Sequence, residues 1–223
     1  MTLLGIDTST SASAACVLRA DCASFEVEPP PERLAAGPAH ARELMPAVAE
    51  VMERAELDFG DLEAIAVGVG PGTFTGLRIG IATARALAQG RGLPLAPVSS
   101  LAALAAGAGS GAVAAVLDAR RGEVFAAAWD GATALVEPAA YAPEALAERV
   151  LALDVPVRAV GDGAVRFREE LEGAGVAVPV DGSAVHRIAA APLCRLGAAG
   201  EPAERDRLLP DYRREPDAKP PQA

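Results

Sequence analysis

Short apolar runs alternate along the chain with longer stretches in which apolar residues recur at helical spacing. In the first half this pattern predicts three strands, a helix, a strand, a helix, a strand and a short helix. Their expected ranges are 2–6, 12–18, 23–27, 40–55, 62–69, 75–90, 93–98 and 99–106. Pro29, Pro30 and Pro31 end the third strand, because proline cannot donate a backbone hydrogen bond to a sheet.

The second half repeats this order as far as its second helix. Strands are expected over 112–117, 123–129, 132–136, 157–160 and 176–180, and helices over 143–153, 165–173 and 185–196, the last bent at Pro192. The first strand of each half ends in an aspartate, Asp7 or Asp118. An internal duplication explains both features. We therefore predict an α/β protein with a duplicated βββαβαβ order, an N-terminal lobe over 1–106, a C-terminal lobe over 112–199 and a partly disordered tail over 200–223.

Residues 67–80 combine the end of a strand, a Gly-Pro-Gly turn and the start of a helix, an arrangement that often binds anions. Thr73 or Thr75 is expected to cap the helix start. A dinucleotide fingerprint would need a third glycine where Thr73 stands, and a phosphate-binding P-loop would need lysine where Leu77 stands. Neither nucleotide motif is present.

The helix predicted over 75–90 carries small residues at every fourth position, namely Gly76, Gly80, Ala84 and Ala88. They share one face, so another backbone can approach closely. This helix is apolar nearly all round, and the helix over 40–55 is apolar over roughly half its circumference, more than one core requires. The pattern fits either a core helix of an ordinary α/β domain or a helix shared with a partner subunit.

The charge and the lysine content of the chain argue against two kinds of function: tight nucleic-acid binding and lysine-based chemistry. The chain has 223 residues and a formal net charge of −10, and Lys219 is its only lysine. Tight nucleic-acid binding needs a basic patch that releases phosphate counterions, so the chain alone should bind tRNA poorly. A Schiff-base or phosphate-binding lysine within the fold is excluded, because Lys219 lies in the Pro-rich tail.

The cysteines and histidines predict a cytoplasmic protein without a metal centre. Cys16, Cys22 and Cys194 form no C-x-x-C pair and are expected to be buried free thiols, which suits a reducing compartment. His40 and His186 are the only histidines, and neither has a second ligand at a familiar spacing. We expect no signal peptide and no membrane span, since no long apolar run is present.

Two lobes of this order, each with an aspartate after its first strand, resemble the ribonuclease H-like architecture shared by actin, sugar kinases and heat-shock chaperones. Within that superfamily, residues 4–9, 68–80 and 118–125 resemble the TsaB (YeaZ) family. His40 with Leu44 and Pro46 is similar to the start of that family's first helix. The tail departs from the pattern, since Tyr212-Arg213 stands where the family tends to carry Tyr-Leu-Arg.

The resemblance implies a non-catalytic subunit of the bacterial complex that makes threonylcarbamoyladenosine in tRNA. Its expected partners are a catalytic TsaD-type subunit and a TsaE-type ATPase, with tRNA reached through the complex only. The isolated chain is expected to form a homodimer. The catalytic relative carries a metal-binding H-x-x-x-H, and this chain has no such pair of histidines. We therefore expect no catalytic residue, no metal and no cofactor of its own, with ATP or ADP confined to the complex.

Two other functions stay open: an ATP-dependent phosphotransferase of the sugar-kinase type, and a peptidase-like member of the same superfamily. For the first, a nucleotide cleft would use Asp7, Thr8, Gly161 and Gly163, although Asp7 can equally hydrogen-bond its own turn. For the scaffold, the resemblance places the partner interface on the first two helices. The expected interface residues are His40, Leu44, Val48, Met52, Phe74, Gly76, Arg78, Gly80, Ala84 and Arg85.

Overall fold

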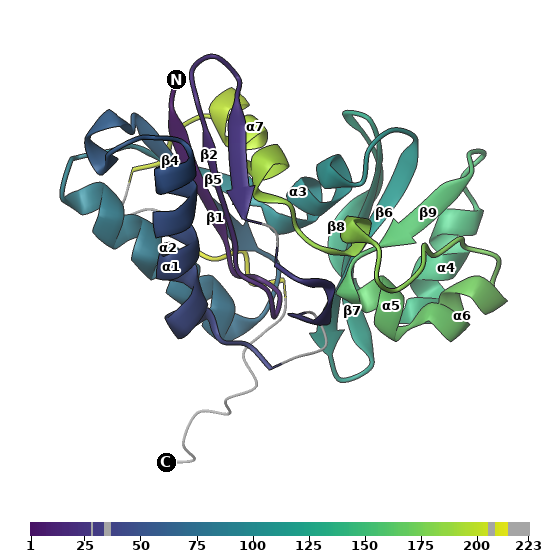
Figure 1. Cartoon of the computed structure of the whole chain (residues 1–223). Coiled ribbons are helices and arrows are strands. Elements are labelled where there is room, and N and C mark those ends of the chain that lie inside the picture. The colour runs from purple at the N-terminus through teal and green to yellow at the C-terminus, as the bar shows by residue number, and fades with distance from the viewer. Residues whose placement is uncertain (28, 34–36, 205–207, 214–223) are drawn as a thin grey trace, which may run out of the picture.

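The computed structural model describes residues 1–27, 29–33, 37–204 and 208–213. It has two lobes, each built on its own mixed β-sheet (Figure 1). The first sheet has the strand order β3-β2-β1-β4-β5, in which β1 runs antiparallel to β2 and parallel to β4. Its strands are β1 (Leu3–Asp7), β2 (Ala14–Leu18), β3 (Ser24–Val27), β4 (Ala64–Gly70) and β5 (Leu95–Ser99).

The second sheet repeats the topology of the first. Its order β8-β7-β6-β9 has the same pairing as β3-β2-β1-β4, with β6 antiparallel to β7 and parallel to β9. This confirms the duplicated two-lobed α/β fold. The elements are β6 (Ala112–Arg120), β7 (Glu123–Asp130), β8 (Thr133–Tyr141), α4 (Pro143–Leu151), β9 (Val157–Val160), α5 (Asp162–Arg166) and α6 (Arg168–Gly173).

Three expectations for the second half were wrong. The strand predicted over 176–180 is reduced to one bridge, between Arg158 and Ala177, because Pro179 lacks the N–H that would extend the pairing. The helix predicted over 165–173 breaks at Phe167, between α5 and α6. The last helix is not bent at Pro192. It begins at Ala190 as α7 (Ala190–Ala199), which places Pro192 in the first turn, where proline is tolerated.

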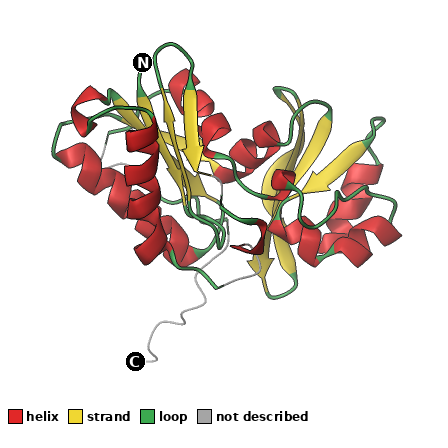
Figure 2. Cartoon of the chain, viewed as in Figure 1, coloured by secondary structure: helices red, strands yellow, loops and turns green. Residues whose placement is uncertain are grey.

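Helices cover both faces of the first sheet (Figures 1 and 2). α1 (His40–Arg54) and α2 (Phe74–Gln89) lie on one face, while α3 (Ser100–Gly107) and α7 lie on the other, toward the second lobe. α7 packs on β1 and β2 of the first sheet, whereas the predicted boundaries assign its residues to the C-terminal lobe over 112–199. The tail over 200–223 was predicted to be partly disordered. Its residues 205–207 and 214–223 lie outside the described residues.

α3 joins the two lobes. Its buried Leu101 and Leu104 belong to one apolar cluster with Val98 of the first sheet and with Leu117 and Phe125 of the second. This shared core holds the two sheets together by burial of apolar surface.

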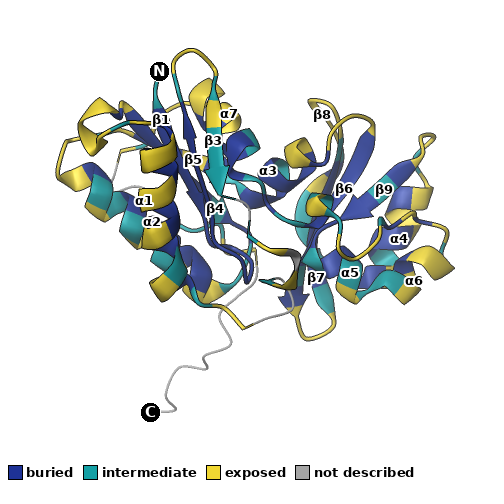
Figure 3. Ribbon diagram, in the orientation of Figure 1, coloured by how far each residue is buried: buried dark blue, intermediate teal, exposed yellow. Residues whose placement is uncertain are grey.

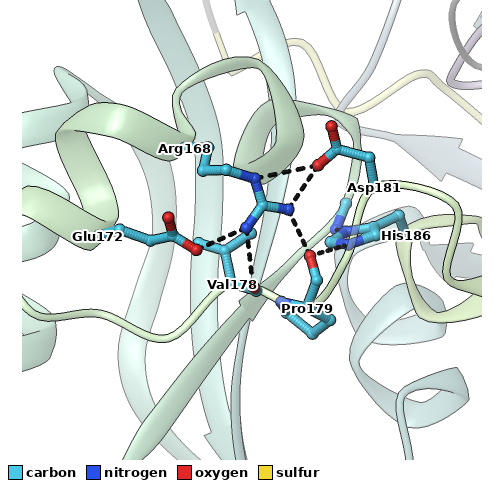
Figure 4. Close-up of polar contacts among 7 residues, drawn as sticks. Arg168, Glu172, Val178, Pro179, Asp181 and His186 are labelled. Carbon is cyan, nitrogen blue, oxygen red and sulfur yellow. Dashed lines mark hydrogen bonds and ion pairs between the residues drawn. The ribbon is translucent and has the colours of Figure 1, made fainter.

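A polar cluster replaces the missing strand of the second lobe (Figure 4). Arg168 donates hydrogen bonds to the Val178 and Pro179 carbonyls and forms ion pairs with Asp181 and Glu172. The buried His186 accepts a hydrogen bond at Nδ1 from the Gly161 N–H at 3.1 Å and donates from Nε2 to the Pro179 carbonyl at 3.0 Å. These contacts anchor the irregular segment that follows α6.

Candidate functional site

Asp7 lies at the end of β1 and is enclosed by its own lobe. Only 1% of its surface is exposed. One carboxylate oxygen accepts hydrogen bonds from the backbone N–H and the hydroxyl of Ser9, and the other accepts one from the Ser100 hydroxyl at 2.7 Å. Burial raises the pKa of Asp7, and these hydrogen bonds partly oppose that shift. The carboxylate thus ties the β1–β2 turn to α3.

Thr8 explains the small residues of α2. Its hydroxyl donates to the Gly76 carbonyl at 2.7 Å, and a Cβ added at Gly76 or Gly80 would overlap Thr8. Ala84 is buried in the same lobe. The backbone that approaches α2 closely is therefore the chain's own β1–β2 turn. The prediction that Gly76, Gly80 and Ala84 face a partner was wrong, because their side of the helix is already covered.

The same correction applies to α1. Leu44, Val48 and Met52 are at most 4% exposed and pack in the first-lobe core against β1, β2 and α2. His40 is buried as well, and its Nδ1 lies 2.9 Å from the Ser13 hydroxyl. The apolar half of α1 that we expected at an interface is thus the half that covers the sheet.

α1 and α2 each have an exposed side that faces away from the sheet (Figure 3). This side carries residues that were not predicted for the partner interface. They include Met45, which is 43% exposed, and four exposed alanines. We call this set the outer helical face, and it consists of Ala41, Met45, Ala49, Ala82 and Ala86. Sequence reasoning missed it because alanine does not stand out in an alanine-rich chain. Its spacing, four residues apart on each helix, was the available signal.

Phe74, Arg78 and Arg85 are the predicted interface residues that reach the surface, and the end of the chain covers them in part. Residues 208–213, the C-terminal strap, cross α2 and reach the second lobe. Tyr212 stacks on Phe74 with ring centroids 5.5 Å apart, and its hydroxyl lies 3.2 Å from Arg78 Nε. Arg85 donates to the Leu208 carbonyl, and Arg213 donates to the Pro138 carbonyl on β8. The strap therefore links both lobes.

A cavity of about 800 Å³ opens between the lobes beside the strap. Four chain segments line it: the start of α1, the start of α2, the β6–β7 turn and the end of the strap. These are residues 38–42, 72–76, 118–121 and 211–213, together with Ile79 and Phe125. Asp7, Thr8, Gly161 and Gly163 do not line this cavity, although Thr8 hydrogen-bonds to Gly76, which does.

Two carboxyl groups meet at the ends of β6 and β9, next to the predicted nucleotide glycines. Asp162 accepts a hydrogen bond at Oδ1 from the Asp118 N–H, and burial raises the pKa of Asp162 to about 6, with the Asp118 charge adding to the shift. The Asp118 side chain forms ion pairs with Arg120 at 3.1 Å and Arg166 at 2.8 Å. These contacts connect the end of β6 to α5 within the second lobe.

The fold and these segments match known proteins. A family model described as tRNA N6-adenosine threonylcarbamoyltransferase (TsaD) matches residues 31–169. One crystal structure, of an uncharacterized protein with similarity to peptidase YeaZ from Pseudomonas aeruginosa, shares 31% identity with a TM-score of 0.81, over 96% of this chain and 99% of that one. The chain belongs to the TsaB (YeaZ) family. No curated protein matches it.

A second structure of a TsaB-family protein, YeaZ from Pseudomonas aeruginosa, shares 30% identity with a TM-score of 0.76, over 94% of this chain and 100% of that one. Among the residues that our structure describes, no three His, Cys, Asp or Glu side chains gather into a metal-binding group. No helix in the described part of the chain is long and apolar enough to cross a membrane.

Proposed function

We propose that this chain is the non-catalytic scaffold subunit of a tRNA threonylcarbamoyladenosine complex, where it binds and supports a TsaD-type catalytic subunit. Membership of the TsaB family supports this role. A TsaE-type ATPase joins the pair, and tRNA is reached through the assembly. The acidic net charge of −10 favours that indirect route, because an acidic surface repels phosphates.

The observation that carries the proposal is the outer helical face. α1 and α2 lie on the same side of the first sheet, and their outward positions present four alanines and Met45 to solvent, among exposed charged residues such as Arg42, Glu50 and Arg78. Small side chains let a partner helix approach closely, and an exposed apolar surface is a mark of protein–protein contact. In the absence of the partner, we expect the same face to pair two copies of the chain.

The sequence around His40 favours a supporting role over a catalytic one. The resemblance gives the catalytic relatives an H-x-x-x-H metal motif, and this chain has no such pair, since His40 and His186 are its only histidines. The carboxylate oxygens of Asp7, which a kinase would use for Mg²⁺, already accept hydrogen bonds from Ser9 and Ser100. The phosphotransferase alternative predicts tight Mg·ATP binding by the isolated chain, which calorimetry measures directly.

The test replaces alanines of the outer helical face with arginine. Ala49→Arg and Ala82→Arg should each weaken binding to the TsaD-type subunit at least tenfold and abolish self-association, because a long charged side chain then separates the helices. Ala198→Arg, on an exposed position of α7, is the matched control. Sedimentation velocity of each variant, alone and mixed with the partner, gives both results. Unchanged partner affinity in both face variants would refute this interface.

A further inference from the structure

The cavity between the lobes carries a positive charge in an acidic protein. Arg42, Arg120, Arg121 and Arg213 line it, against Asp118 and Asp211, so arginines outnumber carboxylates in its wall although the whole chain carries a net charge of −10. Asp118 pairs with Arg120, and Asp211 with Arg213. The Arg42 guanidinium makes no ion pair or hydrogen bond to any residue that the structure describes.

Buried polar atoms at the same cavity have no partner either. His40 is only 3% exposed, and its Nε2 makes no hydrogen bond within the described residues. The Thr73 hydroxyl is likewise buried without a partner, and it does not cap α2. Most buried polar groups in proteins are hydrogen-bonded, so a ligand that reached these two atoms, which belong to residues lining the cavity, would gain hydrogen bonds there.

The start of α2 adds donors to this wall. Thr73 precedes the helix and Phe74, Thr75 and Gly76 form its first turn, and all four line the cavity. The first N–H groups of a helix have no acceptor within it and attract negative charge. When the Ser13 hydroxyl donates to Nδ1 of His40, its Nε2 carries the proton and is a further donor at the cavity.

The rest of the wall is apolar and aromatic. Phe74 and Phe125 contribute rings, and Ile79 and Ala119 add apolar surface. Tyr212 stacks on Phe74, and the Arg78 guanidinium lies over the Phe74 ring, with its Cζ 3.7 Å from the centroid. A cavity of about 800 Å³ is large enough for a drug-sized molecule rather than a bare ion. Its occupant should therefore combine an anionic head with an apolar body.

We propose that this cavity binds a small organic anion. A carboxylate or phosphate head is held by Arg42 and the first turn of α2, and an aromatic or apolar body rests against Phe74 and Phe125. None of the predicted nucleotide residues lines the site. The site needs no partner subunit, since the isolated chain contains every group, although Ala41 of the outer helical face also lines the cavity.

Calorimetry on the full chain at low salt tests the proposal with four probes: phenyl phosphate, benzoate, phenol and inorganic phosphate. Phenyl phosphate or benzoate should bind at least tenfold more tightly than phenol or inorganic phosphate, because each carries both head and body. Whichever of the two binds more tightly identifies the head group. If neither binds at millimolar concentration, the proposal is wrong.

Variants then locate the binding. Arg42→Ala should weaken the tighter probe at least fivefold, whereas Arg195→Ala, which removes an exposed arginine of α7, should change it less than twofold. Phe74→Ala should weaken phenyl phosphate without weakening inorganic phosphate. Equal effects of Arg42→Ala and Arg195→Ala would place any binding outside the cavity and overturn the assignment.

Discussion

Replacing Gly80 with alanine tests whether the inner face of α2 belongs to the core. A Cβ at this position would lie closer than 3.0 Å to the Thr8 hydroxyl oxygen, a separation that real Cβ atoms do not adopt. That hydroxyl donates to the Gly76 carbonyl at 2.7 Å, and Thr8 is only 1% exposed. The hydroxyl therefore cannot turn to solvent when it is displaced.

Two costs oppose one gain in Gly80→Ala. Alanine in place of glycine stabilises a helix interior by about 1 kcal/mol. Overpacking costs about 1–3 kcal/mol, and a buried hydroxyl that loses its acceptor costs about 1–3 kcal/mol. The costs exceed the gain, and we expect a net loss of about 1–5 kcal/mol. Gly173→Ala, at the last residue of α6, is the control for a free Cβ, because nothing lies within 4 Å of it, and we expect no loss of stability there.

A double-mutant cycle assigns the loss to Thr8. In a Thr8→Ala background the overlapping oxygen is absent, so Gly80→Ala should cost at least about 1 kcal/mol less than in the wild type. Urea unfolding followed by circular dichroism gives the midpoint urea concentration of each variant. A change in midpoint reports a change in stability when the slope m is the same for all variants. The reasoning fails if Gly80→Ala is as stable as the wild type, or if its cost is the same in both backgrounds.

The remaining predictions concern the second lobe and the strap. The pKa of Asp162 is about 6 in the folded chain against 3.8 for the ordinary group, so its contribution to stability is present at low pH and is lost as pH rises through 6. Asp162→Asn keeps the acceptor for the Asp118 N–H, and we expect it to raise stability at pH 7 by up to about 3 kcal/mol; urea midpoints that run parallel with the wild type between pH 4 and 7 would contradict this. Tyr212→Ala removes the stack on Phe74 and should speed trypsin cleavage after Arg213, whereas Tyr212→Phe keeps the ring and should not. Mass spectrometry of the digest distinguishes the two, and equal cleavage rates would count against the strap.

Periodicity predicted the existence of most elements, because a buried strand or a helix face leaves a local pattern. It could not say what approaches the small face of α2. Gly76 and Gly80 indicate a close backbone, and the pattern is the same whether that backbone is a partner helix or the chain's own Thr8. Only the three-dimensional path of the β1–β2 turn decides between them.

The cavity was beyond sequence reasoning for a similar reason. Arg42, Thr73, Arg120 and Tyr212 come from four segments that are far apart in the chain, and each has an ordinary local setting. The motif around Gly72 indicated a bare helix start. Neither the unpartnered Nε2 of His40 nor the arginines around it can be recognised before the lobes are in place.

The position of α7 has a consequence for biosynthesis. α7 covers β1 and β2, Ala203 pairs with Leu95, and Leu208 fills the apolar core of the first lobe. α7, Ala203 and Leu208 leave the ribosome only after the whole second sheet has been translated. The lobe that is translated first is therefore completed last, and until then one face of its sheet stays uncovered in the nascent chain.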